Sequence, residues 1–227
     1  MVEPFYDTEF AGYEIGIDEV GRGPMFGRVY SGAVVLPKEG FDYSAMKDSK
    51  KFTSKKKLAA AAEYIKTHAL YWAVSWESET TIDKINIRQA TFKAMHQNVK
   101  KILEKINVEG KFTTYDDIFL LVDGHDFKPY TIIDGDCFTA INHDCVKGGD
   151  NKYASIAAAS ILAKVERDSY ILELCEKYPV LCDRYGLDGN KGYGAKRHMD
   201  GIREHGITQW HRKSFGICKT ADFNPVS

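Results

Sequence analysis

Residues Tyr13 to Val35, YEIGIDEVGRGPMFGRVYSGAVV, hold two strand-like runs separated by a loop rich in glycine. Up to Asp18 the first run alternates apolar and polar residues, the period-2 pattern of a strand with one buried face. Asp18 is therefore expected to face away from the core. Val29 to Leu36 is the second run, and the glycines and proline between the runs predict two neighbouring antiparallel strands joined by a short loop.

Asp18 and Glu19 stand where the first strand ends, and Arg22 follows between two glycines. Adjacent side chains of a regular strand point to opposite faces, so both acids serve one site only if the chain twists or bulges there. Two carboxylates brought together repel unless a cation lies near them. Taken alone, such an acid pair is more often a solvated strand end without function.

The composition predicts a soluble globular domain. The chain has 227 residues, 44% of them hydrophobic and 28% charged, with no apolar run of membrane-spanning length and no charged-then-apolar leader at Met1 to Glu9. We therefore expect an intracellular, cytoplasmic protein with no membrane association. The five cysteines form no C-x-x-C pair, which predicts reduced thiols and no structural zinc site.

The net charge of −1 hides two basic segments. Lys47 to Lys57 contains six lysines, and Lys191 to Lys213 contains six lysines or arginines together with three histidines. Such runs are commonly just solvated surface. Around a cluster of carboxylates they also suit a substrate with a phosphate backbone.

Three further elements follow the opening strands. Thr53 or Ser54 is the expected N-cap of a helix that runs to about Thr67. His68 to Trp76 alternates as a third strand, and its aromatic face is expected in the core. Asp83 to Lys105 carries the apolar stripe of one long helix.

Ile118 to Val122 is an unbroken apolar run, typical of a strand buried on both faces. Asp123 follows directly, at the strand end where open α/β sheets bind ligands, although Asp-Gly is also an ordinary turn. Phe138 to Val146 predicts a weaker strand. Asp150 then precedes a strong helix over Lys152 to Tyr178.

The remaining chain is predicted to be less regular. Pro179 stops the preceding helix, and glycines recur from Cys182 onward, so a glycine-rich loop is expected there. Lys196 to Glu204 predicts a short helix. Thr220 to Ser227 is expected to be a loose tail.

Three segments thus offer carboxylates, with no histidine or cysteine pattern beside them. Oxygen-only ligation selects hard cations such as Mg²⁺ or Mn²⁺. Two such ions ~4 Å apart can activate a water and stabilise the leaving oxygen of a phosphodiester. Metal-dependent phosphodiester hydrolysis is the chemistry that this pattern predicts.

Several spaced motifs carry a resemblance to a known family. They are GIDEVGRGP at Gly16 to Pro24, DSK at Asp48 to Lys50, LVDG at Leu121 to Gly124, KGGDNKYASIAAASILAKVERD at Lys147 to Asp168, and KGYG at Lys191 to Gly194. Together they resemble ribonuclease HII, the type 2 ribonuclease H, from about Tyr13 to Phe215. The resemblance implies an α/β protein with a ribonuclease H-like fold, a mixed five-stranded sheet flanked by helices, and a helical C-terminal extension. We expect an N-terminal tail at residues 1–12, the catalytic domain at 13–180 and a substrate-binding extension at 181–227.

The family's metal-binding and catalytic acids match Asp18, Glu19, Asp123 and Asp150, the same four that the strand ends and turns indicate. The family's G-R-G loop matches Gly21, Arg22 and Gly23, and its tyrosine matches Tyr193; these residues are implied to contact the ribose 2′-hydroxyl, which distinguishes RNA from DNA. Ser49, Lys50 and Lys152 resemble residues that contact phosphate. Asp168 also matches, and its place 18 residues after Asp150 favours a supporting role.

The resemblance implies an endoribonuclease that hydrolyses the RNA strand of RNA/DNA hybrids and cuts on the 5′ side of ribonucleotides embedded in DNA. Two Mg²⁺ or Mn²⁺ ions, 3′-hydroxyl and 5′-phosphate products, a nucleic-acid partner and a monomeric state are expected. No clamp-binding Q-x-x-L-x-x-F-F motif occurs in Gly216 to Ser227, so protein partners are unknown.

Two departures from the family pattern are the segment Met25 to Arg28 and the added glycine of Gly148-Gly149. A resolvase-like or type 1 nuclease of the same superfamily is the runner-up. A non-catalytic module that binds hybrids is the alternative from another class. The related type 3 enzymes carry an extra N-terminal domain, for which we expect no room before Tyr13.

Overall fold

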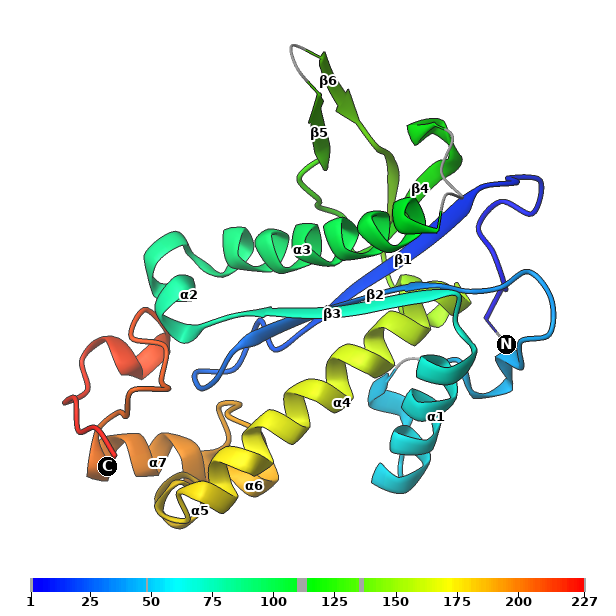
Figure 1. Cartoon of the computed structure of the whole chain (residues 1–227). Helices are drawn as coiled ribbons and strands as arrows, with labels where there is room; N and C mark the ends of the chain where they lie inside the picture. Colours follow the sequence, from blue (N-terminus) through cyan, green and yellow to red (C-terminus); the bar gives the residue numbers. More distant parts are fainter. Residues whose placement is uncertain (1, 48, 110–113, 135–136, 227) are drawn as a thin grey trace. The chain divides into compact units, whose positions relative to one another are not determined.

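The computed structural model describes residues 2–47, 49–109, 114–134 and 137–226. A five-stranded sheet has the order β3, β2, β1, β4, β7, and β5 and β6 form a separate hairpin (Figure 1). The strands are β1 (Tyr13–Val20), β2 (Val29–Val35), β3 (Tyr71–Glu77), β4 (Ile118–Asp123), β5 (Thr131–Asp134), β6 (Cys137–Ala140) and β7 (Asn142–Val146). The α-helices are α1 (Lys55–His68), α2 (Glu79–Ile85), α3 (Ile87–Val108), α4 (Ala154–Lys177), α5 (Val180–Tyr185), α6 (Leu187–Asn190) and α7 (Lys196–His205).

The chain folds into two compact units that alternate along the sequence. Unit 1 comprises Met1–Val20, Ser31–Ser75 and Phe92–Val165, and unit 2 comprises Gly21–Tyr30, Trp76–Thr91 and Glu166–Ser227. The domain organisation expected from the sequence, with a boundary at residue 180, stays a prediction.

Unit 1 is built on the sheet, with β1 parallel to β4 and β4 parallel to β7. Helix α3 covers one face, where Ile15, Val122 and Met95 join one apolar cluster. Helices α1 and α4 cover the other face, where Val34, Ile65 and Ala158 join a second cluster (Figure 1). The predicted α/β fold with a mixed five-stranded sheet and flanking helices is confirmed.

The expectation that β1 has only one buried face is wrong. Glu14 and Asp18, on the supposedly exposed face, are only 7% and 4% exposed. At Gly16 a Cβ atom would lie 2.3 Å from the main chain of Ser155, so α4 approaches the strand too closely for any side chain. The small residues at the start of α4 allow this contact and cover the second face of β1.

The predicted aromatic core face of the third strand is confirmed only in part. Tyr71 and Ala73 of β3 are buried in the α3 side of the core, whereas Trp76 is 43% exposed and the ring of Trp72 is only partly covered. The alternation itself is as predicted. Trp72 and Val74, on the opposite face of the strand, pack partly buried against the second apolar cluster.

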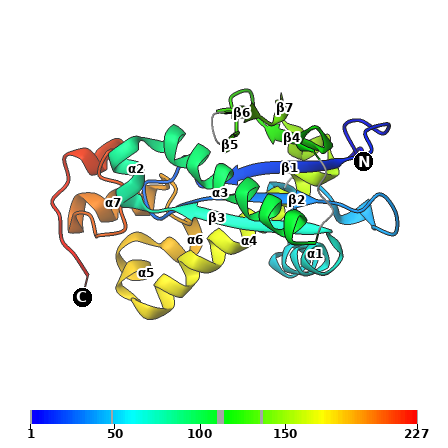
Figure 2. The same cartoon turned by 45° about the horizontal axis from the view of Figure 1, so that its top comes forward.

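Two predicted elements are each divided in the structure. The single helix expected over Asp83 to Lys105 is α2 and α3, separated at Asn86, whose φ of 66° ends the first helix. The single strand expected over Phe138 to Val146 is β6 and β7. Strand β6 pairs with β5, a strand not predicted, and only β7 joins the main sheet beside β4 (Figure 2).

The helix predicted after Ser54 is confirmed, since the Ser54 hydroxyl caps α1. In unit 2, α7 is confirmed within one residue. The glycine-rich loop expected from Cys182 instead contains α5 and α6. The expected loose tail is wrong, because Phe223 pairs with Ile207 and the main chain of Asn224 donates to the Ile207 carbonyl at 2.8 Å.

Candidate active site

Asp18 and Asp123 lie near the ends of two neighbouring parallel strands. Ile17 of β1 pairs with Val122 of β4. Asp18 directly follows Ile17 in the sequence, and Asp123 directly follows Val122. Since paired strands lie ~4.8 Å apart, this register brings the two carboxylates together. The placement predicted from the sequence, an acid delivered at the end of a buried strand, is therefore what the sheet provides.

The carboxylate of Asp18 is buried and closely surrounded. Its Oδ1 accepts the main-chain N–H of Glu19 at 2.7 Å, and the hydroxyl of Ser160 donates to it from α4. Burial raises the pKa of Asp18 well above its usual range, and the charges of Glu19 and Asp123 raise that pKa further. A solvated strand end is excluded, because a surface carboxylate would have neither the burial nor these neighbours.

Serine hydroxyls form hydrogen bonds around Asp18 and its strand, β1. The Ser49 hydroxyl lies 3.0 Å from that of Ser160, and Ser49 is only 5% exposed. The Ser31 hydroxyl donates to the main-chain carbonyl of Asp18 at 2.9 Å, and Asn98 donates to the Ser31 carbonyl. Ser49, predicted to contact phosphate, thus has its hydroxyl turned towards Ser160, and its phosphate contact stays a prediction.

Gly149 connects Asp123 and Asp150, the third and fourth predicted acids. Its N–H donates to Asp123 Oδ1 at 2.7 Å, and a Cβ at this position would lie 2.4 Å from the end of the Ile156 side chain. Asp150 follows in a short 3-10 helix, Gly149–Asn151, is 6% exposed and accepts a hydrogen bond from the Asn151 amide. The second glycine of the sequence departure is therefore a position where only glycine fits without a shift.

Cationic side chains accompany this loop in unit 1. Lys51 donates to the side chain of Asn151, and Lys152 is exposed. The side chain of Lys50 lies outside the described residues. The phosphate contacts predicted for Lys50 and Lys152 stay predictions.

The carboxylate oxygens of unit 1 suit a hard cation in their chemistry. A dication would also offset the repulsion that raises the pKa of Asp18. Among the described residues, however, no group of three His, Cys, Asp or Glu side chains is arranged to hold a metal ion. The structure thus supplies the close pair of Asp18 and Asp123, and a complete ligand set remains part of the proposal below.

In unit 2, the predicted ribose-reading loop is held through its main-chain carbonyls by a buried arginine. The guanidinium of Arg212, 0% exposed, donates to the carbonyls of Gly21 at 2.6 Å, Arg22 at 3.0 Å and Gly27 at 2.8 Å. Burial, followed by the charge of Arg167, lowers the pKa of Arg212 to about 9. With three of its carbonyls used internally, the loop has a fixed main-chain shape, and the side chain of Arg22 stays exposed.

Arg167 is a second fully buried arginine, and it donates hydrogen bonds to main-chain carbonyls of the segment that follows Gly23. Its Nη2 donates to the carbonyls of Phe26 and Lys191, while its Nη1 has no partner in the described part of the chain. Gly21 has a φ of 89°, and a Cβ there would lie 2.2 Å from Arg167 Nε. Gly21 is thus required both for its left-handed conformation and for the close passage of Arg167.

Tyr193 lies beside this loop with its ring 42% exposed. A Cβ on Gly23 would lie 3.8 Å from the Tyr193 ring, and the Arg167 guanidinium lies 5.7 Å from the ring centre. The structure therefore brings together Gly21, Arg22, Gly23 and Tyr193 as the sequence predicted. Their contact with a ribose stays a prediction.

The departure at Met25 to Arg28 contributes packing contacts within unit 2. The Phe26 ring stands edge-on to His211 at 4.9 Å, and the Arg28 guanidinium lies 3.6 Å from the centre of the Trp76 ring. Aromatic and cation–π contacts of this kind stabilise the loop. The expectation that this departure removes no catalytic group stays a prediction.

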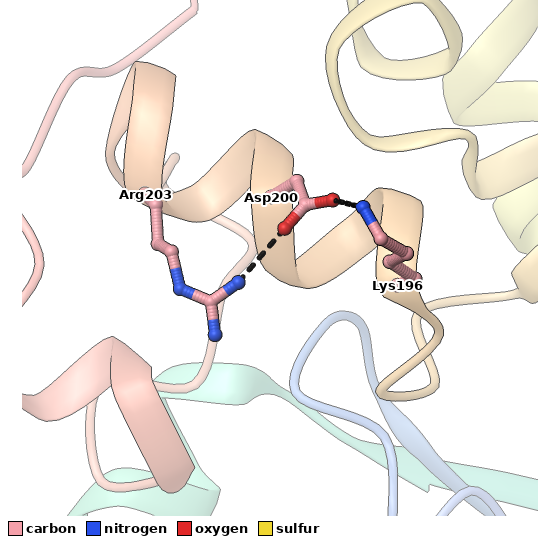
Figure 3. Close-up of polar contacts among 3 residues, drawn as sticks. All are labelled: Lys196, Asp200 and Arg203. Carbon is pink, nitrogen blue, oxygen red and sulfur yellow. Dashed lines mark hydrogen bonds and ion pairs between the residues drawn. The ribbon is translucent and has the colours of Figure 1, made fainter.

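The basic segment Lys191 to Lys213 is only partly a charged surface. Its His198, His211 and Arg212 are buried, and Lys191 is 7% exposed. On the exposed face of α7, Asp200 accepts hydrogen bonds from Lys196 at 2.6 Å and Arg203 at 2.8 Å (Figure 3). The interpretation of the whole segment as a solvated basic run is therefore wrong, because four of its nine basic side chains are buried in the fold.

Asp168 lies in unit 2 on α4, directly after Arg167. It is half-buried, and its charge opposes the lowering of the Arg167 pKa that burial causes. This position agrees with the supporting role expected for it. That role stays a prediction.

Sequence reasoning missed several residues that the structure makes central: Gly149, Ser160, Arg167, His198, His211 and Arg212. A signal existed for one pair. Ser160 and Arg167 are seven residues apart and so share a face of α4, the face with the small residues. Nothing in the sequence distinguishes the buried histidines and Arg212 from the charged residues around them.

Solved structures show the same fold. The ribonuclease H2 from Pyrococcus horikoshii OT3 superposes with a TM-score of 0.64 at 19% identity, covering 91% of this chain and 95% of that one. Bst-RNase HIII in complex with Mn²⁺ gives 0.61 at 22% identity, covering 88% and 64%. The RNase HII of a PCNA complex from Archaeoglobus fulgidus gives 0.58 at 24%, covering 90% and 95%. The fold is that of the type 2 and type 3 ribonucleases H.

Sequence comparison narrows this class to one family. The family model for ribonuclease HII matches residues 15–218. The ribonuclease HII of Bacteroides thetaiotaomicron is 42% identical over 224 residues, 99% of this chain and 98% of that protein. That of Parabacteroides distasonis is 42% identical over 217 residues, 96% of each. The chain belongs to the ribonuclease HII family.

Membership defines the enzyme class as a type 2 ribonuclease H, a metal-dependent hydrolase that acts on RNA in RNA/DNA hybrids. The runner-up nuclease classes and the non-catalytic module are thereby set aside. Among the described helices, none has the length and apolar character needed to cross a membrane.

Proposed function

We propose that this enzyme, besides degrading RNA in hybrids, cuts duplex DNA on the 5′ side of a single embedded ribonucleotide. The products carry a 3′-hydroxyl and a 5′-phosphate. Water is the nucleophile, and Mg²⁺ or Mn²⁺ is required. The observation that carries the metal-dependent part is the buried carboxylate of Asp18, beside both Glu19 and Asp123.

In this proposal Asp18, Glu19, Asp123 and Asp150 would together hold two cations. When bound, the cations supply an activated water and neutralise charge on the leaving oxygen. The protein residues hold their carboxylates in place. Gly149 fixes Asp123 through its N–H, and Ser160 and the Glu19 main chain fix Asp18.

Ribose recognition is assigned to the loop of Gly21, Arg22 and Gly23 together with Tyr193. Two features support this assignment. Arg212 donates to the carbonyls of Gly21 and Arg22 and so restrains the main chain of the loop, and the side chains of Arg22 and Tyr193 are exposed. A restrained loop of glycines can approach a sugar closely, which makes recognition of one 2′-hydroxyl feasible.

The lysines at the start of α1 support a phosphate-backbone substrate. Lys55 to Lys57 fill the first turn, which contains no acidic residue. Cations are unfavourable beside the positive end of a helix dipole, so their presence there indicates a role other than stability. We assign them, with Ser49, Lys50 and Lys152, to sequence-independent contacts with phosphate.

The test is cleavage of two duplexes that differ by one 2′-hydroxyl, with Mg²⁺ or Mn²⁺ added. We expect cutting only of the duplex with the ribonucleotide. Asp123→Asn should lower the rate by at least about 100-fold, since a metal contributes several kcal/mol to the barrier. Arg22→Ala should reduce discrimination between the two duplexes.

Exposed residues provide the matched controls. Asp116→Asn and Arg203→Ala remove the same charges at the surface and should cut like the wild type. The proposal is wrong if the wild type leaves the ribonucleotide duplex intact with either cation, or if Asp123→Asn cuts it normally.

A further inference from the structure

Two histidines of unit 2 are buried against each other. His198, on α7, is 0% exposed, and His211 is 1% exposed. Their Nε2 atoms lie 3.2 Å apart. The rings of Tyr185 and Phe26 pack on His211, each at 4.9 Å, so water is excluded from one side of the pair.

The neighbours of this pair permit one arrangement of protons. The main-chain N–H of Thr208 donates to His211 Nδ1 at 2.9 Å, so this nitrogen carries no proton. The proton of the neutral imidazole is then on Nε2, which donates to His198 Nε2. His198 therefore carries its proton on Nδ1, which donates to the Tyr193 carbonyl at 2.9 Å.

The end of this chain of hydrogen bonds is the main chain of Tyr193. The Tyr193 carbonyl also accepts the N–H of Ala195 at 2.8 Å, and the Tyr193 N–H donates to the Asn190 carbonyl at 3.0 Å. Both polar main-chain groups are thus fixed, while the ring is 42% exposed beside Gly23. The main chain of Tyr193 is therefore held at both its N–H and its carbonyl.

We propose that Thr208, His211 and His198 form a hydrogen-bond relay of neutral imidazoles that positions Tyr193 for ribose recognition. His198 and His211 are positioning residues in this scheme, since neither contacts the substrate. The inference rests on the proposed function of Tyr193 as a reader of the 2′-hydroxyl.

The surroundings of the pair favour the neutral state that the relay needs. The titratable groups that face it are Tyr185, whose hydroxyl donates to the Gly206 carbonyl, and Tyr193, and no carboxylate among the described residues contacts either ring. Burial lowers the pKa of His198, and burial followed by the charge of His198 lowers that of His211 to about 3. A second proton on either ring would set two N–H groups against each other.

The first experiment reads the protons directly. Correlation of ring protons with ¹⁵N in the wild-type protein at neutral pH identifies the tautomer of each histidine. We expect His211 protonated on Nε2 and His198 on Nδ1. The opposite tautomer at either residue, or a charged imidazole, would overturn the relay.

The second experiment uses two substitutions at one position. His198→Asn places an amide N–H near the position of Nδ1 and keeps the donor to Tyr193, whereas His198→Gln reaches towards His211 and loses that donor. After correction for the folded fraction, we expect kcat on the single-ribonucleotide duplex to be about wild type for His198→Asn. For His198→Gln we expect a kcat about tenfold lower with little change in KM.

Equal kcat values for the two variants would contradict the link to Tyr193, since a merely structural role affects folding and not the turnover of folded enzyme. Tyr193→Phe is the reference. If it cuts like the wild type, the proposed role of Tyr193 fails while the tautomers still test the relay. If Tyr193→Phe is impaired and His198→Gln is not, the relay alone fails.

Discussion

The acid pair of unit 1 and the arginine-supported loop of unit 2 both contain buried charge. The groups around the charge are unfavourable at the acid pair and favourable at the loop. Around Asp18 the nearby charges have the same sign, and two carboxylates raise the pKa of a third. The buried guanidinium of Arg212 donates hydrogen bonds to three main-chain carbonyls, so the loop is held in place without a bound cation or ligand. The acid pair is therefore typical of a site that needs a bound cation, whereas the loop is typical of a binding surface that is formed before any ligand arrives.

The two regions are expected to contribute differently to the stability of the fold and to the activity of the enzyme. Groups that repel one another destabilise the fold and are retained for chemistry, whereas groups that satisfy buried carbonyls stabilise the fold directly. Substitutions in the two regions should therefore change the free energy of unfolding in opposite directions.

The largest effect on stability is expected for Arg212→Lys. The three hydrogen bonds use three different nitrogens of the planar guanidinium, whereas a lysine carries its N–H donors on one nitrogen and cannot reach all three carbonyls, so buried acceptors are left unpaired. We expect a loss of about 2 to 4 kcal/mol in the free energy of unfolding, measured with denaturant. Arg203→Lys on the exposed face of α7 is the control and should change it by less than about 0.5 kcal/mol. Similar effects for the two variants would remove the distinction.

A pH-dependent loss of stability is expected from His211. Its pKa is about 3 in the folded protein and near 6.5 when unfolded, so the unfolded chain binds a proton that the folded chain does not. Stability is therefore complete above pH 6.5 and decreases as the pH falls towards 3, by about 1.4 kcal/mol per unit. The measurement is the difference in unfolding free energy between the wild type and His211→Asn, in which other titrating groups cancel. A difference that is constant between pH 7 and 5 would contradict it.

A smaller change of opposite sign is expected for Asp18→Asn. The asparagine keeps an acceptor for the Glu19 N–H and removes a buried charge that Glu19 and Asp123 repel. In the absence of divalent cations we expect the free energy of unfolding to rise by about 1 kcal/mol, in the range of other relieved active-site charges. A decrease in stability would show that the acid pair is balanced by the protein itself and needs no cation.

Much of the fold follows from patterns that the sequence displays openly. The apolar run before Asp123, the capping Ser54 and the small residues of α4 each predict their element correctly. What failed depends on tertiary packing. No local pattern shows that α4 closes over the second face of β1, or that Asn86 adopts a positive φ and splits a helix.

The candidate acids were predictable because they lie at strand ends and turns. The loop of Gly21, Arg22 and Gly23 was predictable because it matches the family motif. The buried supports were not. Arg212 and His211 carry the side chains typical of a surface, and only the carbonyls and rings that surround them in the fold make burial favourable. Sequence reasoning therefore identified the groups expected to act and missed those that hold them.

The paired terminal segments affect where the chain tolerates added sequence. Glu3 exchanges main-chain hydrogen bonds with Lys152 and Ala154, just after Asp150, and Val226 pairs with the Gln209 side chain, just before His211. A fused domain or affinity tag joined tightly at either segment would pull on a neighbour of the predicted catalytic or recognition residues. A spacer of flexible residues is therefore advisable at both ends of any fusion protein made from this chain.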